Sequence, residues 1–179
     1  MTGTLAYFDI TKTNIATTDP NESNFSILTG EVKSRGVELD VAGEILPGWN
    51  IIAAYAYDDA FVSEDNSTPV GNRLANVSRH SFSLWNTYQI QQGDFKGLGF
   101  GLGFYYVGEK AGDLANSFEV PSYFRTDASI FYRQNNWKAQ LNFQNLFDID
   151  YYTGSGEFRA GGVFPGAPFS VVGSISITF

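Results

Sequence analysis

Apolar and polar residues alternate along most of this chain, and residues 169–179 show the pattern in its simplest form. Side chains on a β-strand point to opposite faces in turn, so alternate residues share a face. One face here carries apolar residues and one glycine, namely Phe169, Val171, Gly173, Ile175, Ile177 and Phe179. The other carries mainly hydroxyl side chains, namely Ser170, Val172, Ser174, Ser176 and Thr178. The segment predicts an amphipathic strand, which suits either a soluble β-sandwich or a membrane sheet whose strands need roughly 9–11 residues.

Seven further stretches alternate in the same way and predict strands before this one. Their residue ranges are 3–12, 31–45, 49–61, 79–90, 98–107, 123–133 and 137–147. In the range 98–107, leucine and aromatic residues on one face stand against Gly99, Gly101 and Gly103 on the other. Trp49 and Tyr57 lie towards the two ends of one apolar face, as aromatic girdles do at the two interfaces of a membrane. Large residues at both ends also suit a soluble strand.

The connections between these predicted strands alternate in length. Long polar connections follow the first, third, fifth and seventh strands, beginning with residues 17–24 and ending with residues 148–168. Short turns follow the second, fourth and sixth strands. Outer-membrane β-barrels have short periplasmic turns and longer extracellular loops, whereas a soluble sandwich has no reason to sort its loops in this way. The predicted fold class is therefore all-β, an antiparallel transmembrane β-barrel segment of about eight strands.

The composition narrows the classes of function. The 179 residues suit one domain or a piece of a larger one, and 16 Phe, 10 Tyr and 19 Gly favour strands and turns. No Cys, one Met and one His leave little for a redox or transition-metal centre. A net charge of −8 argues against a nucleic-acid partner, which needs Lys and Arg for its phosphates. The residues after Met1 do not form a signal peptide, so an exported protein would need a further N-terminal part.

Several short motifs occur in a recognisable order. They are residues 34–40 (S-R-G-V-E-L-D), 47–49 (P-G-W), 54–58 (A-Y-A-Y-D), 72–81 (N-R-L-A-N-V-S-R-H-S), Trp85, 106–108 (Y-V-G), 123–127, 142–148 (N-F-Q-N-L-F-D), Tyr151 and 165–168 (P-G-A-P). The ordered set, rather than any single motif, resembles the C-terminal barrel portion of TonB-dependent siderophore receptors, nearest the ferrichrome-type group. The resemblance covers essentially the whole chain. One departure is Phe169, where the family commonly has Arg.

The resemblance implies an outer-membrane receptor and transporter for ferric siderophores. Such receptors have a barrel of about 22 strands closed around a plug domain, and the plug and the TonB-contacting segment precede the barrel. We therefore expect residues 1–179 to be the C-terminal part of the barrel, surrounded by outer-membrane lipid, with the plug domain and signal peptide absent. The chain would reach the TonB complex only through that missing part. The alternative is a self-contained eight-stranded outer-membrane barrel with a structural or adhesive role, since eight strands can close a small barrel.

The resemblance also implies a binding site without resident cofactor, metal ligands or catalytic residues, because the iron arrives already chelated. Aromatic residues of the long loops, namely Phe118, Tyr152, Phe158 and Phe164, could contact the chelate, and Arg159 could attract an anionic one. The alternative role for these residues is in a membrane girdle or in loop packing. Six charged residues are predicted to line the lumen, namely Arg35, Glu38, Asp40, Arg125, Asp127 and Arg133.

The one histidine offers a test for enzyme chemistry. His80 and Ser81 are adjacent, and neighbouring residues on a strand point to opposite faces, so they cannot form a nucleophile–base pair. A pairing of His80 with Ser78 or Ser83 would also need a third group to orient the base, and nothing in the sequence marks one. We expect the chain not to be an enzyme.

Overall fold

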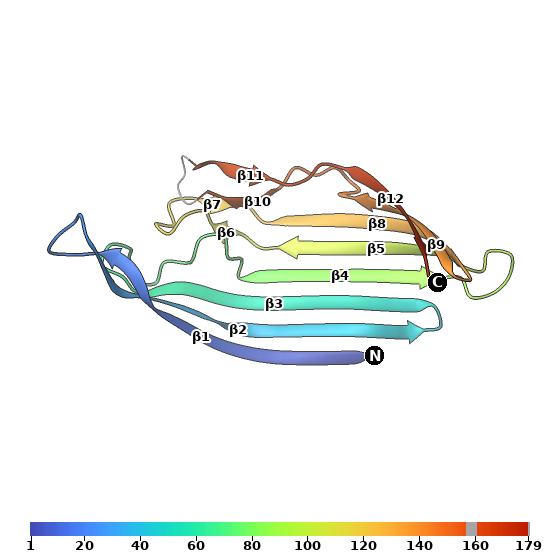
Figure 1. Ribbon diagram of the computed structural model, residues 1–179, viewed down its shortest axis with the longest axis horizontal. Helices are drawn as coiled ribbons and strands as arrows, with labels where there is room; N and C mark the ends of the chain where they lie inside the picture. Colours follow the sequence, from blue (N-terminus) through green and yellow to red (C-terminus); the bar gives the residue numbers. More distant parts are fainter. Residues whose placement is uncertain (157–160, 179) are drawn as a thin grey trace.

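The computed structural model describes residues 1–156 and 161–178 and is built from β-strands (Figure 1). Eight strands form one antiparallel sheet in the order β1-β2-β3-β4-β5-β8-β9-β12. They are β1 (Thr2–Thr18), β2 (Ser26–Leu46), β3 (Trp49–Glu64), β4 (His80–Gln89), β5 (Leu98–Val107), β8 (Tyr123–Gln134), β9 (Trp137–Gln144) and β12 (Ser170–Ile177). The eight predicted strands are confirmed. Within the described ranges, no helix has the length and apolar character to cross a membrane.

The sheet is open at both sides. Among the described residues, β1 pairs only with β2, and β12 pairs only with β9. Figure 1 shows these two strands as the edges of the sheet, with both chain ends at the end that carries the short turns. The eight strands therefore form an arc of wall, and the last strand does not close against the first. Each edge keeps a row of backbone groups that could pair with another strand.

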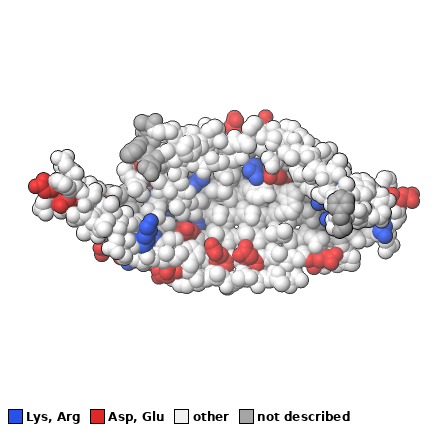
Figure 2. Space-filling model, viewed as in Figure 1, with Lys and Arg blue, Asp and Glu red and all other residues white. Residues whose placement is uncertain are grey.

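The register divides every strand into an outward and an inward set of side chains. Leu39 lies opposite Tyr55, which lies opposite Phe82, and this row continues through Tyr106 on β5. All four side chains are exposed, as they should be on a surface that faces lipid. The other set forms the inward face, which Figure 2 shows as hollowed along its middle. The predicted alternation thus becomes a convex apolar face and a concave polar face.

The glycines of β5 are covered by aromatic rings from the two neighbouring strands. A Cβ atom at Gly99 would lie 2.2 Å from the ring of Phe131, and one at Gly103 would lie 2.4 Å from the ring of Trp85. Glycine is therefore required here by close contact rather than by a turn. The sequence placed these glycines on one face of the strand, and the structure shows that neighbouring rings occupy the space beside them.

Several predicted boundaries differ from the observed ones. Residues 17–18 were expected in a loop, but β1 continues through Thr18 and pairs there with Ser26, since threonine suits an extended backbone. β9 ends at Gln144 because Asn145 adopts a φ of 50°. Two of the predicted loops contain short hairpins, formed by β6 (Lys110–Ala111) with β7 (Glu119–Val120) and by β10 (Tyr152–Ser155) with β11 (Val163–Pro165).

Candidate functional site

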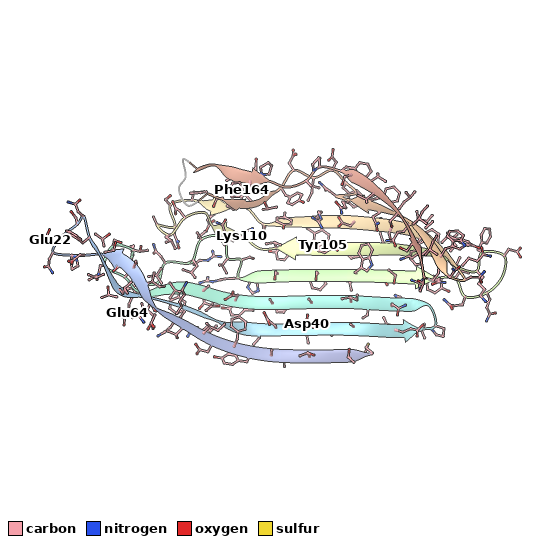
Figure 3. The ribbon with its side chains drawn as sticks, in the orientation of Figure 1. Glu22, Asp40, Glu64, Tyr105, Lys110 and Phe164 are labelled. Atoms are coloured by element: carbon pink, nitrogen blue, oxygen red, sulfur yellow. The ribbon has the colours of Figure 1, made fainter. Side chains whose placement is uncertain are left out.

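The concave face of the sheet is the first part of the candidate site. A cavity of about 360 Å³ lies on it between β2 and β8, and its lining includes Glu38, Asp40, Ser81, Tyr105 and Arg125. Figure 3 shows Asp40 and Tyr105 on separate strands of this face. The two carboxylates project from β2, and the guanidinium group projects from β8. The wall therefore presents negative charge on one side of the cavity and positive charge on the other.

Arg125 is held by aromatic and acidic neighbours. Its Nη2 donates to Asp127 Oδ2 at 3.0 Å, and its Nη1 donates to Tyr151 Oη at 3.2 Å. The guanidinium carbon lies 4.7 Å from the centre of the Tyr105 ring, which is within the range of a cation–π contact. The ring of Tyr123 packs on Tyr151 with 4.6 Å between centroids. These contacts fix the guanidinium group against the wall.

The Asp127 carboxylate also links the sheet to the segment that follows β9. Asp127 Oδ1 accepts a hydrogen bond from the backbone N–H of Asn145 at 2.9 Å. The Asn145 side chain is buried, donates to the carbonyl oxygens of Ile149 and Ala167, and accepts from the Ile149 N–H. One asparagine thus satisfies backbone groups from two parts of the last long loop. Sequence reasoning missed this role, although the motif around residues 142–148 contains it.

Side-chain-to-backbone bonds also join the loops at the external end. Asn76, in the connection after β3, donates to Ser155 O and accepts from the Ser155 N–H on β10. Ser155 in turn donates to Gly112 O at 2.5 Å. Lys110 is buried, and its Nζ donates to Thr153 O at 2.5 Å (Figure 3). Burial lowers the pKa of Lys110 below its ordinary value. The three long connections that follow β3, β5 and β9 are therefore joined by hydrogen bonds into one cluster at this end of the sheet.

The structure describes three of the five predicted ligand-contacting residues. Tyr152 on β10 and Phe164 on β11 are exposed on one hairpin (Figure 3). Phe118 is half-buried, and its ring lies against Gly112, where an added Cβ atom would meet it at 2.2 Å. Phe158 and Arg159 lie outside the described residues. Contact between any of the five and a ligand stays a prediction.

The predicted lumen charges need one correction. Five of the six lie on the inward set of side chains, but Arg35 does not. It shares the outward set with Val37, lies opposite Asp59 and binds that carboxylate at 3.3 Å. The prediction for Arg35 was wrong because the period-2 alternation that makes Val37 face outward also turns Arg35 outward.

The surroundings of His80 differ from those of a catalytic base. Its Nδ1 is hydrogen-bonded to Tyr55 Oη at 3.0 Å on the outward face. The Ser78 hydroxyl donates instead to the His80 carbonyl oxygen, and Ser83 belongs to the inward set with Ser81. Among the residues that the structure describes, no group of three or more His, Cys, Asp or Glu is arranged to hold a metal ion.

The open antiparallel sheet, with its apolar convex face and its hydrogen-bonded long loops, has the form of a segment of barrel wall. Comparison with known proteins identifies its family. Residues 1–146 match the family described as TonB dependent receptor-like, beta-barrel. The chain therefore belongs to the TonB-dependent receptor β-barrel family of bacterial outer-membrane proteins.

Relatives of known identity match nearly the whole chain. The metal-pseudopaline receptor CntO of Pseudomonas aeruginosa strain UCBPP-PA14 is 36% identical over 98% of this chain and 25% of its own length. The ferrichrome outer membrane transporter/phage receptor of Escherichia coli K12 is 36% identical over 97% of this chain and 24% of its own length. The crystal structure of the siderophore receptor PiuA from Acinetobacter baumannii superposes with a TM-score of 0.83 at 31% identity, covering 98% of this chain and 26% of that one. The chain thus spans about a quarter of the length of these relatives.

Proposed function

We propose that this chain forms part of the barrel wall of an outer-membrane receptor that imports ferric siderophores in a TonB-dependent manner. The observation that carries the proposal is the match to siderophore and metallophore receptors over 97–98% of the chain at 36% identity. In this proposal residues 1–179 are the C-terminal part of the barrel, and a plug domain and a TonB-contacting segment lie elsewhere in the receptor. The open edges of β1 and β12 would then pair with other strands of the same barrel.

In the intact receptor the concave face would line the lumen, and the external loops would meet the ligand. The exposed rings of Tyr152 and Phe164 are candidates for contact with the chelate, and Phe118, Phe158 and Arg159 remain further candidates. The iron is cargo and arrives with its own ligands, so the chain needs no resident metal, cofactor or catalytic residue. Its work would be binding and transport rather than catalysis. A self-contained eight-stranded barrel would need β1 to pair with β12, and the described residues lack that pairing.

Uptake of radioactive iron tests the proposal. Cells without siderophore receptors of their own would express the receptor that carries this chain and would be given ferric ferrichrome, ferrioxamine B or metal-pseudopaline. We expect TonB-dependent accumulation from at least one of these chelates and none from residues 1–179 expressed alone, because that segment lacks a gate and a TonB contact. If no chelate accumulates in a TonB-dependent way, or if residues 1–179 suffice, the proposal is wrong.

Two loop variants test the predicted contacts. Tyr152→Ala and Phe164→Ala should each weaken binding of the transported chelate by roughly tenfold, because truncating an aromatic contact costs about 1–2 kcal/mol. Phe95→Ala is the control, since Phe95 is also an exposed aromatic residue but lies in the short turn after β4 at the other end of the sheet. Unchanged affinity in both loop variants would exclude these residues from the site.

A further inference from the structure

The β10–β11 hairpin carries Tyr152 and Phe164 and is fixed to neighbouring loops through β10. Ser155 on this strand is buried, with 3% of its surface exposed, whereas Tyr152 at the other end of the strand is 40% exposed. Lys110, from the connection after β5, binds the carbonyl oxygen of Thr153 between them (Figure 3). The hairpin is therefore held along one strand while the rings of Tyr152 and Phe164 stay accessible.

Asn76, in the connection after β3, makes three hydrogen bonds to Ser155 with one side chain. Its Nδ2 donates to Ser155 O at 3.0 Å, and its Oδ1 accepts from the Ser155 backbone N–H at 2.8 Å and from the hydroxyl group at 3.2 Å. The backbone N–H of Asn76 in turn donates to Ala111 O at 2.9 Å. The amide thus exchanges a donor and an acceptor with one residue of β10, as a paired strand does, and both of its polar atoms are used in doing so.

Gly154 brings the Asn76 amide and the Phe164 ring to the same point of β10. A Cβ atom added at Gly154 would lie 2.9 Å from Asn76 Oδ1 and 3.7 Å from Phe164 Cδ2. Phe164 also lies opposite Gly154 in the register of the hairpin. The φ of Gly154 is not positive, so glycine is required here by the close approach of the amide rather than by the backbone. The place of the Phe164 ring therefore depends on the strand that Asn76 holds.

We propose that Asn76 is a positioning residue of the ligand site, which orders the rings of Tyr152 and Phe164 without touching the ligand itself. The proposal rests on the proposed function, in which these two rings contact the chelate. A ligand that binds rings already held in place has less conformational entropy to remove than one that must order a free hairpin. Loss of the Asn76 amide therefore weakens binding although both rings remain in the chain.

Asn116, in the connection after β5, offers a matched control. Asn76 and Asn116 both adopt a positive φ, of 64° and 53°, and the Asn116 amide also bonds both backbone groups of one residue, Arg73, at 2.9 Å. Its other side-chain hydrogen bonds to the described residues go to the carbonyl oxygens of Asp113 and Leu114, so they do not reach β10. Because glycine tolerates a positive φ, Asn76→Gly and Asn116→Gly each remove an amide without straining the backbone.

Hydrogen–deuterium exchange of the intact receptor, purified in detergent and without ligand, measures the hairpin directly. In Asn76→Gly we expect the backbone amides of residues 152–155, 163 and 164 to exchange about tenfold faster, because fewer hydrogen bonds oppose local opening. Gly154→Ala should have the same effect, since its Cβ atom displaces the Asn76 amide. Asn116→Gly should leave these amides unchanged. Unchanged exchange in Asn76→Gly, or equal increases in the two asparagine variants, would overturn the proposal.

Equilibrium binding of radioactive ferric ferrichrome, ferrioxamine B and metal-pseudopaline then tests the link to the ligand. Asn76→Gly should weaken binding about fivefold in the receptor with both rings, and less than about twofold in a receptor that also carries Tyr152→Ala and Phe164→Ala, because its effect passes through those rings. Equal losses in the two backgrounds, or unchanged affinity with a loosened hairpin, would overturn the positioning role alone. If the unaltered receptor binds none of the three chelates, the proposed function fails and this proposal fails with it.

Discussion

The two halves of the wall have the same strand pattern but bury very different amounts of their inward face. Apart from Thr17, Ala60 and Val62, the buried non-glycine side chains of the described residues all lie between residues 110 and 155. On β2, by contrast, Glu38 and Asp40 are exposed. Aromatic rings and the bonded loops cover the inward face around β8, whereas the described residues leave Glu38 and Asp40 of β2 uncovered. Period-2 alternation therefore sets which way a side chain points, but not whether it is buried.

The largest effect should follow from breaking the buried network around β8. Asp127→Ala leaves the Arg125 guanidinium and the Asn145 N–H without their shared acceptor, and loss of one partner of a buried ion pair costs about 3 kcal/mol or more. Urea unfolding in detergent, followed by tryptophan fluorescence, measures this loss. Glu38→Ala removes an exposed carboxylate from the same face and should change the free energy of unfolding by less than about 0.5 kcal/mol. A similar loss of unfolding free energy in the two variants would contradict the claim that only the half around β8 depends on buried contacts.

A smaller effect should follow from adding one methyl group to a covered glycine. Gly103→Ala would bring a Cβ atom to 2.4 Å from the Trp85 ring, and such overpacking costs about 2 kcal/mol. Gly3→Ala, in the open half, would bring its Cβ atom no closer than 3.7 Å to Asp40 O, which is an ordinary contact. The same urea titration should therefore show destabilisation only for Gly103→Ala, and equal stability of the two variants would show that the Trp85 ring can move aside freely.

Alkaline pH should strengthen the bonded loops through Lys110. Because burial lowers its pKa below 10.5, the folded chain binds fewer protons than the unfolded chain between the two pKa values, and stability rises with pH across that window. Below the lowered pKa the buried ammonium group carries its full desolvation cost. Limited proteolysis of the external loops at increasing pH should show this gain in the wild type and a smaller one in Lys110→Met. The same gain in both proteins would contradict the role of Lys110.

The smallest effect should come from the acidic row of the open half. Glu38→Gln combined with Asp40→Asn removes two like charges that make no hydrogen bond or ion pair with the described residues. We expect a change in unfolding free energy within about 0.5 kcal/mol, in the stabilising direction. A loss of more than about 1 kcal/mol in the urea titration would mean that the chain itself depends on these carboxylates.

Much of the fold could be predicted, because strand alternation is a local property. The eight strands, their short turns and the lipid-facing residues follow from period-2 patterns within single segments. The hairpins β6–β7 and β10–β11 escaped prediction because strands of two to four residues are too short to show a period. The roles of Asn76 and Asn145 escaped because each depends on where a distant loop lies. Both adopt a positive φ, which asparagine tolerates better than most residues.

The sequence by itself determined the strands, the two faces of each strand, the sorting of the loops and the resemblance to receptor barrels. Only the tertiary structure decided that the sheet stays open, that rings from β4 and β8 cover the glycines of β5, and that Arg35 faces outward and binds Asp59. It alone also joined Asn76 to Ser155 across a separation of 79 residues. The physical reason is that alternation is encoded within a few residues, whereas strand closure and side-chain-to-backbone bonds depend on the positions of segments far apart in the chain.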